Sequence, residues 1–159
     1  MTTLSALKNR HATSEFQGYH LTRFQRWHVP HLGDPAAGFS TFAQDFGMLQ
    51  SLEAGLNNWT IMADGAPIAS GGTLELWPGR SVAWAHLGKM TAEHMLAITR
   101  EAYRCVRRPQ GRVEMTVRMD FPAGHRWARM LGFKVETACL ENYDPDGTDH
   151  VGYILVNRR

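Results

Sequence analysis

The sequence predicts an α/β domain, in which a mixed sheet with parallel central strands carries helices on both faces. The strongest observation lies in the last third of the chain. There, apolar and polar residues alternate from Val113 to Met119, and the spacing then becomes helical from Phe121 to Leu131. A period of two is typical of a half-buried strand, and apolar positions three and four apart are typical of a helix. An earlier helical stretch also separates two strands, and helices between strands favour parallel pairing at the centre of a sheet.

Length and composition indicate one globular domain over residues 1–159. A chain of 159 residues can bury roughly 70% of its unfolded surface. Its 43% apolar and 20% charged residues are typical of a folded protein. No apolar run approaches the ~18 residues of a membrane-spanning helix, and the first ten residues lack the apolar core of a signal peptide. Residues 1–18 are expected to form a flexible N-terminal arm.

The N-terminal half is predicted to contain a strand, a helix and a hairpin. A first strand and a turn are expected within Tyr19–Val29, followed by a loop at His31–Pro35. Apolar residues three and four apart predict an amphipathic helix over Phe39–Leu56. Asp64-Gly65 lies between two apolar runs and is a strong hairpin signal.

The next segment is predicted to be a strand followed by a long helix. The strand is expected at Ser81–Leu87, and Thr91 can cap a helix that runs to about Arg108. Pro109-Gln110-Gly111 would end that helix. Cys105 lies within it and is expected to be a small buried residue.

The shorter helix of the last third is expected to end at Gly132 in a left-handed conformation. Trp127, Met130 and Leu131 can share one face of this helix. A tight turn at residues 143–147 would precede the last strand, His150–Val156.

The strand, short helix and Leu131-Gly132-Phe133 leading into another strand resemble the C-terminal half of a GCN5-related N-acetyltransferase (GNAT) domain. The order of elements extends the resemblance from about Tyr19 to Val156 and implies a single GNAT-like domain. The resemblance also implies transfer of an acyl group from acetyl-CoA to an amine. That reaction needs a held cofactor, a neutral amine and a proton for the leaving thiolate.

The resemblance places the cofactor at the turn from the strand ending at Leu87 into the following helix. GNAT enzymes hold the coenzyme A diphosphate on backbone N–H groups of a glycine-rich loop at a helix N-terminus. The turn here has one glycine and one lysine and does not match that loop. The candidate cofactor-binding residues are Leu87, Gly88, Lys89 and Thr91, and an ordinary helix start is the alternative.

The residues expected to move protons in a GNAT enzyme are replaced here. The family often has a tyrosine four residues before the glycine of Gly-Phe and an asparagine earlier in the helix, where this chain has Ala128 and Phe121. Neither side chain can transfer a proton, so His125 and Tyr143 are the nearest candidates for a general acid. For His125, a surface position beside Arg126 is the alternative.

The candidates for a general base lie near the central strands and are Glu75, His86 and Glu114. The substrate cleft of the GNAT fold opens near the splay of the strand that carries His86, so this histidine can face the cleft. A structural histidine is the alternative. Glu75 and Glu114 alternate with apolar neighbours, which is also typical of solvent-facing strand positions.

Charge and metal-binding signals are weak. Arg100, Arg104 and Arg107 form a basic stripe on one helix, which fits a solvated face, an acidic protein partner or a nucleic-acid backbone. A net charge of +2 does not by itself indicate nucleic-acid binding. Two cysteines are too few for a disulfide framework or a zinc site, and the N-terminal histidines lack metal-ligand spacing, so no metal is proposed.

Residues 67–72, residues 82–89 and the helix with Tyr103 resemble the internal virion protein A family of short-tailed bacteriophages. Members of this family are small GNAT-like proteins with a similarly altered cofactor loop, and the similarity covers roughly Trp59–Val156. It implies a protein made in the bacterial host cytoplasm and used in assembly of the virion or carried in it, with other virion or assembly proteins as partners. One hypothesis is therefore a virion component without efficient catalysis. The alternative is an active acetyl-CoA-dependent N-acyltransferase acting on a protein or a small amine.

Overall fold

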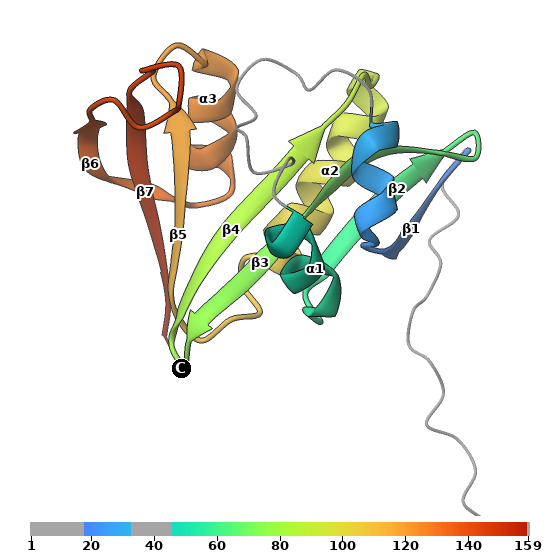
Figure 1. Cartoon of the computed structure of the whole chain (residues 1–159), viewed down its shortest axis with the longest axis horizontal. Helices are drawn as coiled ribbons and strands as arrows, with labels where there is room; N and C mark the ends of the chain where they lie inside the picture. The colour runs from blue at the N-terminus through green and yellow to red at the C-terminus, as the bar shows by residue number, and fades with distance from the viewer. Residues whose placement is uncertain (1–17, 33–45, 159) are drawn as a thin grey trace, which may run out of the picture.

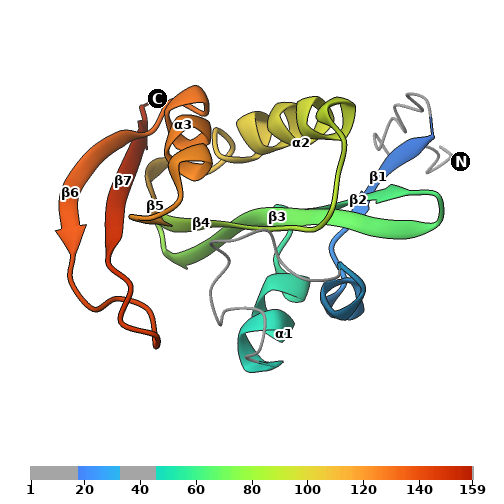
Figure 2. The same ribbon diagram turned by 90° about the horizontal axis from the view of Figure 1, so that it is seen from above.

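The computed structural model describes residues 18–32 and 46–158, which form one mixed sheet with helices on both faces (Figures 1 and 2). In chain order the elements are β1 (Tyr19–Arg23), the 3-10 helix η1 (Arg26–His31), α1 (Phe46–Ala54), β2 (Asn58–Ala63), β3 (Ala66–Trp77), β4 (Arg80–Leu87), α2 (Ala92–Cys105), β5 (Gly111–Arg118), α3 (Pro122–Met130), β6 (Lys134–Leu140) and β7 (His150–Asn157). The predicted arm before residue 18, the predicted loop at 33–35 and the predicted helix before residue 46 lie outside the described residues.

The seven strands follow the order β1-β2-β3-β4-β5-β7-β6. Neighbouring strands are antiparallel except β4 and β5, so the parallel pairing predicted for the centre of the sheet is this one pair. The α/β class with a mixed sheet is confirmed. The hairpin between β2 and β3 is also confirmed, because Asp64 and Gly65 both have positive φ, at 50° and 76°.

The parallel strands β4 and β5 pair at one end only. Their register runs from Arg80 opposite Arg112 to Val82 opposite Glu114, although β4 continues to Leu87 and β5 to Arg118. The two strands diverge beyond that point (Figure 1). Past Val82, the backbone groups of β4 that face β5 are therefore not paired with it, which opens the middle of the sheet.

Two apolar clusters cover the two faces of the sheet. The larger cluster lies under α2 and α3 and includes Ile98, Cys105, Ala128 and Tyr153. The smaller cluster lies on the opposite face, where η1 and α1 contribute Val29, Leu49 and Leu52 around Phe24. Figure 2 shows α2 and α3 on one side of the sheet and α1 on the other.

Several predicted boundaries change in the structure. The segment after β1 is the 3-10 helix η1, where a turn was expected. Helix α2 ends at Cys105 and not at Arg108, because the N–H groups of Arg107 and Arg108 bond to the carbonyls of Arg104 and Cys105, three residues back. Gly132 ends α3 with φ of 94°, as predicted.

Met130 does not share the buried face of α3 with Leu131, although their spacing allowed one common face. Leu131 is 2% exposed and Met130 is 66% exposed. The buried stripe of α3 runs through Gly124 and Ala128 and continues to Leu131, and Met130 projects away from it.

Candidate functional site

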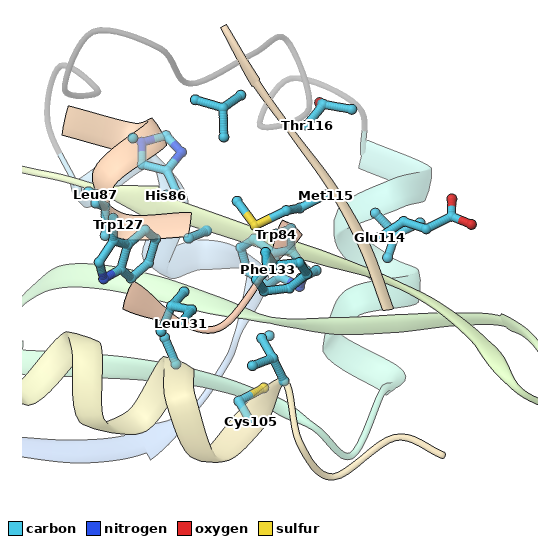
Figure 3. A pocket seen from close by; sticks show the side chains of 18 of the residues that line it. Trp84, His86, Leu87, Cys105, Glu114, Met115, Thr116, Trp127, Leu131 and Phe133 are labelled. Carbon is cyan, nitrogen blue, oxygen red and sulfur yellow. The ribbon is translucent and has the colours of Figure 1, made fainter. Parts of the chain in front are cut away.

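A cavity of about 240 Å³ opens where β4 and β5 diverge. Its walls come from both strands and from α2 and α3, and residues from α1 and η1 line it on the opposite face of the sheet. Large apolar side chains surround it, among them Trp84, Met115, Trp127 and Phe133 (Figure 3). Such a cleft suits a narrow, mainly apolar ligand that passes through the opened sheet.

A hydroxyl, an imidazole and a carboxylate form one polar cluster on the cavity wall. Thr116 Oγ1 in β5 lies 3.0 Å from His150 Nδ1 in β7, and His150 Nε2 lies 3.0 Å from Asp144 Oδ2 in the β6–β7 connection. Both Thr116 and His150 line the cavity, and His150 and Asp144 are buried. Gly152 is the β7 residue opposite Thr116, so the contact between Thr116 and His150 runs diagonally across the two strands.

Arg118 holds Asp144 and the rest of the β6–β7 connection in place. Its guanidinium contacts Asp144 Oδ2 at 2.9 Å, Asp146 Oδ2 at 3.0 Å and Asp120 Oδ1 at 3.1 Å. Hydrogen bonds from the backbone and side chain of Thr148, and then from Arg118, lower the pKa of Asp146 to about 2. The loop that supplies Asp144 is therefore anchored to the end of β5 by charge-assisted bonds.

The turn from β4 into α2 is largely bonded within the protein. Gly88 N–H donates to the carbonyl of Ile68 at 2.9 Å, so the pairing of β3 and β4 extends to Gly88. At the helix start, His94 N–H donates to Thr91 Oγ1 and Thr91 N–H donates to His94 Nδ1, a capping box. Glu93 adds a negative charge to the first turn.

These hydrogen bonds determine whether the turn can hold the diphosphate of coenzyme A. A diphosphate needs several free N–H groups at a helix start, and three of those near α2 already have protein acceptors. The turn therefore does not reproduce the family's diphosphate cradle. The cavity, by contrast, is lined mainly by apolar side chains.

The structure brings some predicted site residues together and separates others. His86, Leu87, Glu114 and Tyr143 line the cavity. Lys89 and Thr91 are exposed and Gly88 is buried, all at the α2 turn. Burial lowers the pKa of His86, which favours its neutral form.

Glu114 belongs to a row of alternating charges at the paired end of β4 and β5. Arg80 in β4 donates to both of its carboxylate oxygens, at 2.7 and 2.9 Å, and Arg112 bonds Glu114 and Glu136. The Arg80 hydrogen bonds lower the pKa of Glu114, which makes its carboxylate a weaker base. Glu114 is thus half-buried and ion-paired, whereas Glu75 is exposed as the solvent-facing interpretation expects.

His125 is half-buried and is held by two hydrogen bonds. Its Nδ1 lies 2.8 Å from the hydroxyl of Tyr153 and its Nε2 lies 3.3 Å from the carbonyl of Met119. The carbonyl can only accept, so Nε2 carries the proton and Nδ1 accepts from Tyr153. This pairing joins α3 to β7.

The predicted basic stripe on α2 is not uniform. Arg107 donates to the carbonyls of Leu131 and Tyr103, at 3.0 and 3.2 Å, and is half-buried. Arg104 and Arg100 stay exposed, the former 3.7 Å from Glu101 Oε2. Cys105 is buried as predicted, and burial raises the pKa of its thiol to about 12.

The described residues, 18–32 and 46–158, contain neither a metal-ligand cluster nor a membrane-spanning helix. Among these residues, no three His, Cys, Asp or Glu side chains are grouped to hold a metal ion. None of the helices described is long and apolar enough to cross a membrane.

Comparison with solved structures identifies the fold. Ard1 from Thermoplasma volcanium superposes with a TM-score of 0.68 at 14% identity, covering 90% of this chain and 100% of that one. The ribosomal-protein-S18-alanine N-acetyltransferase from Escherichia coli gives 0.60 at 16% identity, over 89% of this chain and 95% of that one. The chain has the GNAT fold. RimL, a ribosomal α-N-protein acetyltransferase in complex with coenzyme A, is similar at a TM-score of 0.63 and 13% identity, over 89% of this chain and 96% of RimL.

No protein-family model and no curated protein sequence matches the chain. The identities to the solved structures are low, so the likeness concerns the GNAT fold and leaves the activity, and the resemblance to phage proteins, as proposals.

Sequence reasoning missed Thr116, Asp144 and His150 as functional candidates. Thr116 alternates with buried positions in β5, Asp144 is part of a predicted turn, and His150 begins the last strand. The antiparallel pairing of β5 with β7 brings Thr116 and His150 together, and the β6–β7 connection places Asp144 beside His150. A prediction that the last strand pairs with β5 would have indicated that Thr116 and His150 lie close together.

Proposed function

We propose that this protein is an N-acyltransferase that moves an acyl group from a thioester to an amine in the cleft between β4 and β5. The observation that carries the proposal is the cavity at the splay of these strands, with Thr116 and His150 on its wall. Apolar walls accept the acyl chain and exclude water from the reacting carbonyl. An imidazole beside the cavity supplies a group that can take up a proton from the acceptor.

Acetyl-CoA is the first donor to test, because proteins of this fold include RimL, which was solved with coenzyme A. The capped start of α2 predicts that its diphosphate contributes less to affinity than a glycine-rich loop would provide. Lys89 is the exposed cation of this turn. We therefore expect acetyl-CoA to bind weakly. Its affinity should exceed that of a short thioester without the nucleotide by less than it would in a protein with a glycine-rich loop.

The test is formation of an amide. The full chain is incubated with acetyl-CoA or with S-acetyl-N-acetylcysteamine and a panel of peptides with free N-termini or lysines, and acetylated peptide is measured by mass spectrometry. Ala85 lines the cavity, so Ala85→Leu fills part of it and is expected to reduce product at least tenfold. Ala123→Leu, at an exposed position of α3, is the matched control. Equal product from Ala85→Leu and the native chain would count against the cleft as the site.

A second function is favoured by Ala128, which is fully buried where the family often has its acid, together with the capped start of α2. Under this proposal the protein is a structural or assembly component of a phage particle, made in the host cytoplasm, with other virion proteins as partners. Calorimetric titration with acetyl-CoA separates the two functions, because affinity in the micromolar range supports the enzyme. Detection of the chain in purified particles of a phage that encodes it supports the virion component.

A further inference from the structure

We propose that Thr116, His150 and Asp144 act as a nucleophile, a base and a positioning carboxylate, so that the acyl group passes from the thioester to the Thr116 oxygen before it leaves the cleft. The inference rests on the proposed acyl transfer at the same cleft. It adds a covalent step that neither the fold nor the likeness to other GNAT proteins supplies. The activity it predicts is thioester cleavage with an ester on Thr116.

The tautomer of His150 follows from Asp144, which lies beside Nε2 in an electrostatic contact that lacks hydrogen-bond geometry among the described residues. Its Oδ2 lies 2.9 Å from Arg118 Nη1 and 3.0 Å from His150 Nε2. A carboxylate paired with arginine can only accept, so the nitrogen that faces it carries the proton. His150 Nδ1 is then the nitrogen with a lone pair, and the Thr116 hydroxyl donates to it across 3.0 Å.

This arrangement has the three parts of an activated hydroxyl. The nucleophile lies within hydrogen-bond distance of the base, and a carboxylate lies beside the other nitrogen of the base. The Tyr143 ring packs against the His150 ring, 4.6 Å away from centroid to centroid. Arg118 and Thr148 hold the loop that carries Asp144, so the imidazole is fixed from two sides.

Thr116 also lies directly beside the opening between β4 and β5. The last paired residues of β4 and β5 are Val82 and Glu114, and Thr116 is the next residue of β5 on the same face, just past the point of divergence. The N–H groups of β4 that face β5 beyond Val82 have no partner in that strand. They are available to bind the carbonyl oxygen as negative charge develops on it.

The step balances without any further reagent. Thr116 Oγ1 forms a bond to the thioester carbonyl carbon, and its proton moves to His150 Nδ1. The carbon–sulfur bond breaks, and the thiolate takes that proton to leave as a thiol. An amine or water then attacks the Thr116 ester and gives its proton to His150, which returns one to the Thr116 oxygen. His150 thus supplies the proton that the buried Ala128 cannot.

The experiment uses the full chain and S-acetyl-N-acetylcysteamine, a thioester without a nucleotide. Thiol release is followed with a chromogenic disulfide, and the acetylated residue is located by peptide mapping. Native protein and Thr116→Ser are expected to carry acetyl on residue 116. Thr116→Val, which keeps the side-chain shape, is expected to lose the adduct and at least about 100-fold in thiol release. Thr137→Val makes the same change in β6, and it is expected to behave as the native chain.

A readout independent of activity tests the base and its partner. The ¹⁵N shifts of the His150 ring are expected to show a proton on Nε2 in the native chain, and a mixture of tautomers in Asp144→Asn. A proton on Nδ1 in the native chain overturns the assignment. Thiol release that Thr116→Val leaves unchanged, or acetyl found only on another residue, overturns the covalent step.

The two proposals fail in different ways. If Thr116→Val still makes amide at the native rate, N-acyl transfer stands and the Thr116 ester is overturned. If the native chain releases thiol and carries acetyl on Thr116 without acylating any amine, the covalent step stands and the N-acyltransferase is overturned. If the native chain releases no thiol above the rate of Thr116→Val, the covalent step is overturned.

Discussion

Thr91 and His94 cap each other across the first turn of α2. His94 N–H donates to Thr91 Oγ1 at 3.3 Å, and Thr91 N–H donates to His94 Nδ1 at 3.3 Å. In a protein that binds a diphosphate at a helix start, such N–H groups point at the ligand. Here they are bonded within the protein, so the start of α2 is stable without an anion, and the sequence there needs no glycine-rich loop.

Replacing Thr91 by alanine is expected to destabilise the protein by about 1 kcal/mol, because His94 N–H loses its acceptor at the helix start. Urea unfolding of Thr91→Ala against the native chain measures this difference. Thr91→Ser keeps the hydroxyl and should retain nearly all of the stability. A Thr91→Ala chain as stable as the native one would show that the cap contributes nothing.

Asn58 joins three elements in the smaller apolar cluster, and its loss is expected to cost about 2–3 kcal/mol. Asn58 Nδ2 donates to the carbonyl of Leu52 at 2.7 Å, and its Oδ1 accepts from Trp84 Nε1 at 2.8 Å. Asn58→Ala leaves both of these partners without their hydrogen bond inside the fold. Denaturant unfolding measures the loss.

A double-mutant cycle isolates the bond between Asn58 and Trp84. Trp84→Phe removes the indole N–H and keeps an aromatic ring, so its effect in the Asn58→Ala background should be smaller than in the native one. We expect a coupling energy of about 1 kcal/mol. Additive effects of the two substitutions would show that this hydrogen bond does not stabilise the fold.

Stability is expected to fall as the pH decreases below about 6.5, because two buried histidines resist protonation. Burial lowers the pKa of His86 and of His28 from the ordinary value of 6.5. The unfolded chain then binds these protons at a higher pH than the folded chain. The two histidines contribute fully to stability above the pKa that they have in the unfolded chain. This contribution is lost as the pH falls from that pKa toward their lowered pKa values in the folded chain. Urea midpoints from about pH 7.5 to about pH 5 measure the slope.

In the double variant His28→Asn with His86→Gln, stability should decrease less steeply with falling pH over this range, because neither new side chain titrates. Glu101 acts in the opposite direction, since burial raises its pKa and its protonation favours the folded state at low pH. Glu101→Gln should therefore steepen the fall toward low pH. A slope unchanged in the histidine variant would assign the pH dependence to other groups.

Local patterns were sufficient to predict the elements that build the sheet. Alternation over Val113–Met119, the Asp64-Gly65 turn and the Gly132 cap each depend on neighbours in the chain, and each is confirmed. The exposed position of Met130 could not be predicted in this way, because a nine-residue helix allows more than one apolar face and packing against the sheet selects among them.

The candidate site was harder to predict because it depends on contacts far apart in the sequence. His86 and Tyr143 could be singled out as reactive residue types, and both line the cavity. Thr116 and His150 are 34 residues apart, and their contact follows from the register of β5 with β7. Glu114 illustrates the same limit, since its role as an ion-pair partner depends on Arg80 in another strand.

Gly88 is expected to tolerate no side chain, because the end of η1 packs directly against it. A Cβ atom at this position would overlap the carbonyl oxygen of Leu32 and lie 3.2 Å from that of Ile68. Gly88→Ala must therefore displace backbone rather than a flexible side chain, with an expected loss of about 1–3 kcal/mol in urea unfolding. Lys89→Ala, at the exposed neighbouring position, should change stability by less than about 0.5 kcal/mol. Equal stability of the two variants would show that η1 can move away from β4 at no cost.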